Sequence, residues 1–167
     1  MSHIHSFPPI AAANAKILIL GSIPGKASLL ANQYYAYPRN AFWKIIEQLY
    51  DINADLSYDQ RCTQLKQNQV AVWDVLKSCT RTSSLDSDIV ESTIVPNDFT
   101  QFLTDHPQIE AIYFNGSKAK QSFNKHVLPN LSEAAANLAM VRLPSTSPAH
   151  AAVRFEGKLE AWRVIVG

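Results

Sequence analysis

The segment KILILGS, residues 16–22, is a short apolar run that ends in a glycine and a serine. An apolar run of this length predicts a buried strand. Three later segments have the same character and predict three more strands, namely VAVWDV at 70–75, IEAIYFNG at 109–116 and LAMVRLPS at 138–145. These four runs are the frame on which the rest of the fold can be placed.

Helical patterns lie between and after these strands. Apolar side chains recur at helical spacing over residues 42–50, with Asn40 placed as the N-cap. Ser57 and Gln60 form a capping-box pattern at the start of a second helix. Further helices are predicted from residue 97 or 98 to 103, at 117–128 and at 158–166, while residues 77–88 are predicted to form a polar loop.

Alternation of strands with helices is typical of a three-layer α/β/α architecture with a central, mainly parallel sheet. We therefore predict a single domain over residues 1–167, built on a four-stranded sheet. Ligands of such sheets bind at the carboxyl ends of the strands. Those ends carry GSIPG, WDVLKS, FNGS and LPSTSP, so these loops are expected to meet along one edge.

The composition narrows the class of protein. A chain of 167 residues with 47% hydrophobic and 17% charged residues fits one globular domain. Its apolar runs are shorter than the roughly 18–20 residues that span a bilayer, and its N-terminus lacks the basic region of a signal peptide. Cys62 and Cys79 are isolated, which suits a reducing cytoplasm and predicts no metal site and no cofactor.

The net charge of +1 conceals an uneven distribution. Residues 1–50 carry four Lys or Arg and one Asp or Glu, residues 51–110 carry four and ten, and residues 111–167 carry seven and three. Basic ends around an acidic middle allow one positive face on a nearly neutral protein. The distribution permits a nucleic-acid partner without requiring one.

Two loops carry unusual chemistry. GSIPGKAS, residues 21–28, is reminiscent of a phosphate-binding loop, but that motif needs four residues before its Gly-Lys pair and Ser or Thr after it. Only three residues precede the pair here, and alanine follows it, so a tight turn is the alternative. LPSTSPAHA, residues 143–151, is either an ordinary loop or a stiff, hydroxyl-rich loop that offers donors to phosphates.

Taken in order, these motifs resemble those of the uracil-DNA glycosylase superfamily, and within it the hypoxanthine-DNA (deoxyinosine) glycosylase branch. GSIPGKAS, continuing through QYYAYPRNAFW at 33–43, corresponds to the first superfamily motif, and LPSTSPAHA corresponds to the second. VAVWDVLKSC and YFNGSKA match as well, so the resemblance covers nearly the whole chain. It implies the superfamily fold and hydrolysis of the N-glycosidic bond of an extruded base.

Two positions depart from the superfamily pattern. Several branches place a catalytic Asp or Asn before the proline of the first motif, and many place His or Asn before the Pro-Ser of the second. This chain has Ile23 and Leu143 there, and neither side chain can orient water or hydrogen-bond a leaving base. The resemblance to the deoxyinosine branch implies instead that Asn40 is catalytic, where it would position water or contact the sugar. Capping the following helix is its alternative or additional role.

An extruded base needs an aromatic face and hydrogen-bonding groups for its edge. Tyr35 matches the aromatic residue that stacks on the base in related branches. We expect Asn115 to contact the base edge, with a cap between strand and helix as its alternative role. Ser22 and Ser28 are secondary candidates for base binding. For Asp74, a buried structural hydrogen bond is favoured over contact with the base or water.

Phosphate contacts are expected from Lys26, Arg39, Ser145, Thr146 and Ser147, each of which is otherwise a solvated surface residue. The implied partner is double- or single-stranded DNA that contains a deaminated base, and the protein is expected to act as a monomer away from membranes. Hypoxanthine is the expected base, and nothing suggests a Schiff-base lysine, so a monofunctional glycosylase is predicted. The alternatives are a uracil- or mismatch-specific glycosylase, a non-catalytic module that binds damaged DNA, and a nucleoside hydrolase or phosphate-binding enzyme.

Overall fold

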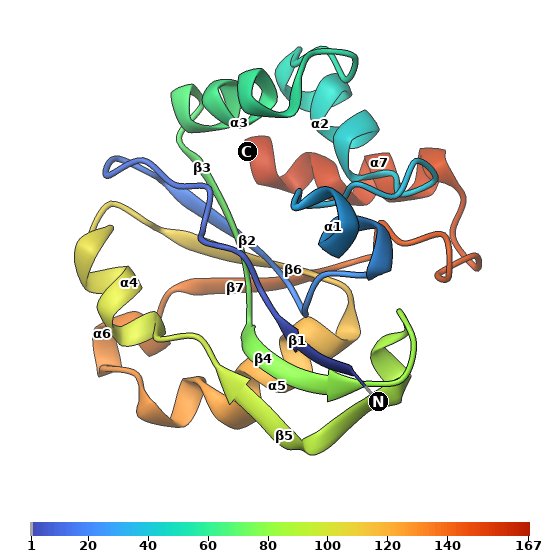
Figure 1. The fold of residues 1–167 in the computed structure, drawn as a ribbon. Coiled ribbons are helices and arrows are strands. Elements are labelled where there is room, and N and C mark those ends of the chain that lie inside the picture. The colour runs from blue at the N-terminus through green and yellow to red at the C-terminus, as the bar shows by residue number, and fades with distance from the viewer. Residues whose placement is uncertain (1) are drawn as a thin grey trace.

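A four-stranded parallel sheet forms the centre of the molecule in the computed structural model, which describes residues 2–167 (Figure 1). The strand order is β3-β2-β6-β7, and all neighbouring strands are parallel. The strands are β2 (Ile17–Gly21), β3 (Val70–Asp74), β6 (Ala111–Asn115) and β7 (Ala139–Leu143). The α/β class and the four predicted strands are confirmed.

β2 lies inside the sheet because it has no polar side chain to keep in contact with water. Every one of its residues is buried, and it is hydrogen-bonded to β3 on one side and to β6 on the other. Successive side chains of a strand point to opposite faces, so Leu18 and Leu20 join one apolar cluster while Ile17 and Ile19 join another. The sheet thus separates two hydrophobic cores.

Helices cover both faces of the sheet (Figure 1). One face is covered by α2 (Phe42–Tyr50), α3 (Tyr58–Gln67) and α7 (Phe155–Trp162), the last of which continues as a short 3-10 helix, Arg163–Val166. The other face is covered by α4 (Phe99–Asp105), α5 (Ser117–His126) and α6 (Glu133–Ala136). The short α1 (Lys26–Ala31) follows β2 at the carboxyl edge of the sheet.

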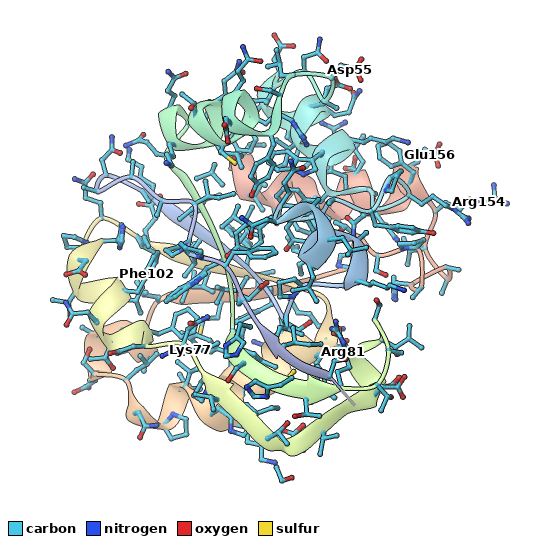
Figure 2. The ribbon with its side chains drawn as sticks, viewed as in Figure 1. Asp55, Lys77, Arg81, Phe102, Arg154 and Glu156 are labelled. Carbon is cyan, nitrogen blue, oxygen red and sulfur yellow. The ribbon has the colours of Figure 1, made fainter. Side chains whose placement is uncertain are left out.

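The predicted capping box of α3 is confirmed. The Ser57 hydroxyl accepts from the Gln60 backbone N–H, and the Gln60 side chain accepts from the Ser57 backbone N–H, both at 3.2 Å. Asp98 caps α4 by accepting from the backbone N–H of Gln101 at 3.0 Å. Figure 2 shows Asp55 and Arg154 at the periphery, pointing away from the core. Among residues 2–167, no helix has both the length and the apolar composition to cross a membrane.

The prediction of a polar loop at 77–88 is wrong for residues 77–81, which belong to a strand. β4 (Leu76–Arg81) and β5 (Ile89–Pro96) form an antiparallel sheet with β1 (Ser2–His5), in the order β1-β4-β5. β4 could not be predicted from the sequence because two of its polar residues, Ser78 and Arg81, are buried beside its apolar residues. Its buried positions therefore do not form the apolar run or the alternation of apolar and polar residues that indicates a strand. Its partner β1 lies more than seventy residues away in the chain, and only tertiary structure brings the two together.

Two helix starts also differ from prediction. α2 begins at Phe42 with Ala41 as its N-cap residue, so Asn40 lies one position too early to be the N-cap. The Asn40 side-chain oxygen still accepts from the Phe42 backbone N–H at 3.0 Å, and it therefore satisfies one free donor of the first turn. α7 begins at Phe155 rather than at Lys158.

Trp162 is the largest fully buried side chain and joins α7 to the sheet edge. Its indole N–H donates to the carbonyl of Pro144 at 2.9 Å, and its ring packs edge-on against Phe42 with centroids 6.1 Å apart. Trp162→Ala should lower the free energy of unfolding by about 3–5 kcal/mol because it leaves a large cavity. Trp162→Phe keeps most of the packing, so it should cost less. Urea unfolding monitored by circular dichroism measures both, and an Ala variant as stable as wild type would contradict this account.

Candidate active site

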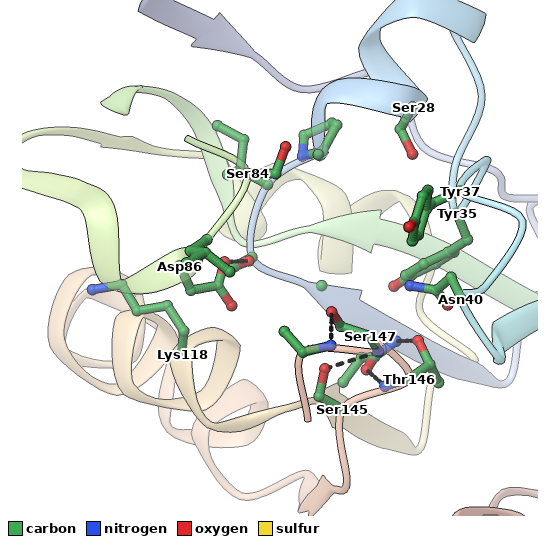
Figure 3. Close-up of a pocket in the computed structure, with 18 of the residues that line it drawn as sticks. Ser28, Tyr35, Tyr37, Asn40, Ser84, Asp86, Lys118, Ser145, Thr146 and Ser147 are labelled. Carbon is green, nitrogen blue, oxygen red and sulfur yellow. Dashed lines mark hydrogen bonds between the residues drawn. The ribbon is translucent and has the colours of Figure 1, made fainter. Parts of the chain in front are cut away.

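A cavity of about 1150 Å³ opens at the carboxyl edge of the parallel sheet (Figure 3). Loops that follow β2, β6 and β7 line it, together with the loop between β4 and β5. All the predicted site residues line this cavity except Arg39. Ligand pockets typically span about 300–1,000 Å³, so the cavity has room for a base and part of its nucleotide.

Tyr35 presents an aromatic surface to the cavity. Its ring stacks on Phe42 with centroids 4.0 Å apart and an interplanar angle of 18°, so the opposite ring face is the one that a ligand can reach. The backbone of Tyr35 is in the left-handed region at φ +56°, which costs a non-glycine residue on the order of 1–3 kcal/mol. Backbone strain of this kind persists only where neighbouring contacts enforce it.

Hydrogen bonds on both sides of Tyr35 enforce that conformation. The Tyr34 carbonyl accepts from the indole N–H of Trp43 at 3.0 Å. The backbone N–H of Ala36 donates to the hydroxyl of the buried Ser28 at 3.1 Å. Ser28 therefore holds the aromatic turn in place, and its own hydroxyl proton is the group left for a ligand.

Asn40 lies beside Tyr35 at the cavity wall (Figure 3). Because its oxygen is bound to the Phe42 N–H, the orientation of its amide is fixed. Nothing within residues 2–167 accepts a hydrogen bond from its NH₂ group. Asn40 thus combines a fixed side chain with free donors that line the cavity.

Asn115 and Thr146 form a paired link between two loops. The Asn115 amide nitrogen donates to the Thr146 hydroxyl, and the Thr146 backbone N–H donates to the Asn115 oxygen, both at 2.9 Å. The Thr146 carbonyl accepts from the Ala41 N–H at 3.0 Å, which ties the same loop to the start of α2. Thr146 is only 1% exposed, so its position suits an anchor of the loop better than the predicted phosphate contact. The second amide proton of Asn115 is not used in this link, and the Asn115 side chain lies near the Tyr35 hydroxyl, where it opposes the rise in the pKa of that phenol.

Internal contacts also hold the remaining serines. Ser22 is buried and donates to a carboxylate oxygen of Asp86 at 2.6 Å. The Ser145 hydroxyl accepts from the Ser147 N–H, and the Ser147 hydroxyl accepts from the Ala149 N–H, each at 3.2 Å. These short-range bonds shape the loop and leave hydroxyl protons available at its surface.

The two predicted basic contacts lie in different places. Lys26 is exposed at the cavity and its backbone N–H donates to the Ser84 hydroxyl at 2.9 Å. Arg39 lines a separate depression together with Lys44 and Lys158. This second depression also includes Thr146, so the loop of the second motif lies between the two basic groups.

Sequence reasoning missed Asp86 and favoured a purely structural role for Asp74. Asp74 is the last residue of β3 and lines the cavity, is 4% exposed and accepts from the Ser6 hydroxyl at 2.7 Å. Burial raises the pKa of Asp74 to about 7, and Asp86 adds to the rise, while Ser6 and Arg81 oppose it. Partial desolvation also raises the pKa of Asp86. The favoured structural hydrogen bond of Asp74 exists, but the residue lines the cavity as well.

Arg81 supports the first loop through a buried hydrogen bond. This residue at the end of β4 is 2% exposed, and its guanidinium donates to the carbonyl of Pro24 at 2.7 Å. No sequence motif indicated this contact, because β4 itself was not predicted.

Lys118 lies at the cavity wall but is held in an ion pair. Its ammonium lies 2.6 Å from a carboxylate oxygen of Glu91, and His126 contacts the other oxygen at 3.1 Å. The bond from Lys118, together with His126, lowers the pKa of Glu91 to about 2. This pairing leaves Lys118 poorly placed to act as a nucleophile.

Asp74 should make the stability of the protein depend on pH. Its pKa of about 7 exceeds the ordinary 3.8, so the folded state keeps a proton that the unfolded chain releases between these values. The free energy of unfolding should therefore fall as the pH rises from about 4 to about 7, by on the order of 4 kcal/mol from this group.

Asp74→Asn retains an oxygen for Ser6 but cannot ionise. Its stability should vary less over that pH range and should exceed that of wild type above neutrality. Urea unfolding of both proteins at a series of pH values measures the difference. Parallel stability curves for the two proteins would show that Asp74 is not buried as described.

Comparisons with known proteins agree with this architecture. The family model for the uracil DNA glycosylase superfamily matches residues 8–165. A hypoxanthine DNA glycosylase of Methanosarcina acetivorans is 36% identical over 137 residues, covering 77% of this chain and 85% of the relative. A hypoxanthine DNA glycosylase of Methanosarcina barkeri is 37% identical over 116 residues, covering 68% of this chain and 71% of the relative. The solution NMR structure of a Methanosarcina acetivorans protein superposes with a TM-score of 0.79 at 29% identity, covering 99% of this chain and all of that one.

Proposed function

Because the chain belongs to the uracil DNA glycosylase superfamily, we propose that it is a monofunctional DNA glycosylase that removes hypoxanthine from deoxyinosine. It extrudes the damaged nucleotide from DNA and hydrolyses the N-glycosidic bond, which leaves an abasic site. The two Methanosarcina relatives, both hypoxanthine DNA glycosylases, support this substrate.

The observation that carries the proposal is the position of Asn40. Its NH₂ group is free, its orientation is fixed, and it lies beside the stacking surface of Tyr35 in the cavity. The two positions where other branches have polar catalytic residues hold Ile23 and Leu143, which are 7% and 4% exposed and pack into the two cores. Asn40 is therefore the polar side chain of the first motif to which we assign the catalytic role.

In the reaction, a water oxygen forms a bond to C1′ of the sugar while the bond from C1′ to N9 of the base breaks. The electron pair of the broken bond leaves with the base, which takes up a proton as the attacking water loses one to become the hydroxyl on C1′. Asn40 cannot remove the water proton as a strong base, so its role is to hold the water or the sugar in place. Much of the rate must come from stabilising the negative charge on the departing base.

The cavity supplies an aromatic face and donors for that base. Stacking of a base on an aromatic ring contributes about 1–3 kcal/mol, and the free face of Tyr35 is the surface for it. The remaining amide proton of Asn115 is placed at the same cavity. Hypoxanthine presents an acceptor at C6, which such a donor can bind, and adenine presents a donor there, which it cannot.

The basic groups lie where a DNA backbone would pass. Lys26 is exposed at the cavity, and the depression formed by Arg39, Lys44 and Lys158 lies beyond Thr146. A strand whose damaged base enters the cavity would place its flanking phosphates near both groups. We further propose that the protein acts as a monomer in the cytoplasm, on double- or single-stranded DNA.

Asn40→Ala should reduce the single-turnover rate on deoxyinosine DNA by about 10²-fold or more, which is the usual loss when one placed polar group is removed. Oligonucleotides with one deoxyinosine, uracil or xanthine, cut with alkali at abasic sites, measure the rate. Asn124→Ala, at an exposed position of α5, is the matched control and should retain activity.

Two results would oppose the proposal in different ways. Rapid excision of uracil, together with an Asn40→Ala variant that keeps the wild-type excision rate, would point to another branch of the superfamily. Binding of damaged DNA by wild-type protein without excision of any base would support a non-catalytic module instead.

Lys26→Ala and Arg39→Ala should weaken DNA binding for all sequences, because phosphate contacts carry no sequence information. Each variant should also reduce the slope of log affinity against log salt by about 1. Fluorescence anisotropy over a salt series measures both quantities. Lys66→Ala, at the other end of the sheet on α3, should leave the slope unchanged, and an unaltered slope in both test variants would place the DNA path elsewhere.

A further inference from the structure

Asp74 lines the cavity but has no role in the reaction described above. It lies at the carboxyl end of β3, and one of its oxygens, Oδ2, accepts from the Ser6 hydroxyl at 2.7 Å. Within residues 2–167, no group donates a hydrogen bond to the other oxygen, Oδ1. The carboxyl group is therefore held at one oxygen and available at the other.

The free oxygen of Asp74 and the hydroxyl of Tyr35 both lie close to Gly21. A Cβ atom added to Gly21 would lie 2.8 Å from Asp74 Oδ1 and 3.0 Å from the Tyr35 hydroxyl, so glycine is needed there for the two groups to approach. The Tyr35 hydroxyl is completely buried and makes no hydrogen bond of ordinary geometry in the described part of the chain, although the Asn115 side chain lies near enough to oppose the rise in the pKa of this phenol. The hydroxyl therefore does not occupy Asp74 Oδ1, which stays available to a ligand in the cavity.

We propose that Asp74 acts as a neutral carboxylic acid that recognises the edge of the extruded base and stabilises it as it leaves. This inference rests on the proposed glycosylase function. The Ser6 hydroxyl donates to Oδ2, so the acid proton belongs on Oδ1, the oxygen beside Tyr35. A donor fixed in that orientation pairs with the C6 oxygen of hypoxanthine. The amino group of adenine would place a donor against it and leave both groups unpaired, the condition that gives strong rejection.

The same proton assists the departure of the base. When the C1′–N9 bond breaks, the electron pair spreads over the purine and increases the negative charge on the C6 oxygen. A hydrogen bond from the carboxylic acid then becomes stronger, which lowers the barrier. An ionised carboxylate at this position would instead repel the departing anion. The protonation state of Asp74 should therefore control the rate.

The surroundings of Asp74 keep a large share of the carboxyl groups neutral up to about pH 7. Burial is the main cause that raises its pKa to about 7, and the carboxylate of Asp86 from the β4–β5 loop acts in the same direction. The guanidinium of Arg81 on β4 and the Ser6 hydroxyl oppose the rise. Tyr34 and Tyr35 are the other titratable groups near it, and both stay neutral because burial and Asp74 raise the pKa of each phenol.

The test is the pH dependence of single-turnover hypoxanthine excision by wild type, Asp74→Asn and Asp74→Ala, from about pH 5 to about pH 9. The wild-type rate should fall about tenfold per pH unit above pH 7, as the carboxyl group ionises. Asp74→Asn offers an uncharged NH₂ donor at the same place, so it should keep most of the rate and lose this alkaline decline. Asp74→Ala should lose about 10²-fold at neutral pH.

The same substrate is used throughout, so titration of the base itself would appear in both wild type and Asp74→Asn. An alkaline decline that persists unchanged in Asp74→Asn, or a wild-type rate in Asp74→Ala, would overturn the inference. Thermal unfolding and DNA affinity at each pH show whether the variants are folded, and the Asn variant decides the question even if the Ala variant is not. Failure of wild type to excise any deaminated base would refute the proposed function instead.

Discussion

The parallel pairing of β2 with β3 and β6 is the constraint on which the rest of the molecule depends. β2 is buried along its whole length and has a hydrogen-bonded strand on each side. Parallel strands must all end at the same edge, so the loops of both motifs are brought to one place, although more than one hundred residues separate them in the sequence. The Asn115–Thr146 pair then fixes the last loop against the third strand, and the Thr146 carbonyl continues this link to α2.

The antiparallel sheet gives the cavity its acidic side. β4 leaves the end of β3 and pairs with β1 from the start of the chain. The loop between β4 and β5 places Asp86 next to Ser22. β4 itself positions Arg81, whose guanidinium donates to the Pro24 carbonyl. The antiparallel sheet therefore influences the electrostatics of the site, because Asp86 raises the pKa of Asp74 and Arg81 lowers it.

Several features of the site reduce stability. Tyr35 has a left-handed backbone and an unsatisfied buried hydroxyl, and Asp74 is a buried carboxyl group with a strongly raised pKa. Each is held in place by contacts away from the cavity, such as the bond from Trp43 to Tyr34 and the bond from Ser6 to Asp74. Ile23 and Leu143, by contrast, pack into the two cores and add to stability.

The sequence alone determined the parallel sheet and most of the cavity. Four apolar runs separated by helical patterns leave few alternatives to an α/β fold, and ligand loops of such a fold must gather at the carboxyl ends of the strands. Ser22, Tyr35, Asn40 and Asn115 could be assigned to the site for that reason. Features that depend on contacts between distant segments could be seen only in the tertiary structure. They include the pairing of β1 with β4, the burial of Thr146 and the desolvation of Asp74, whose pKa depends on surroundings that no local pattern encodes.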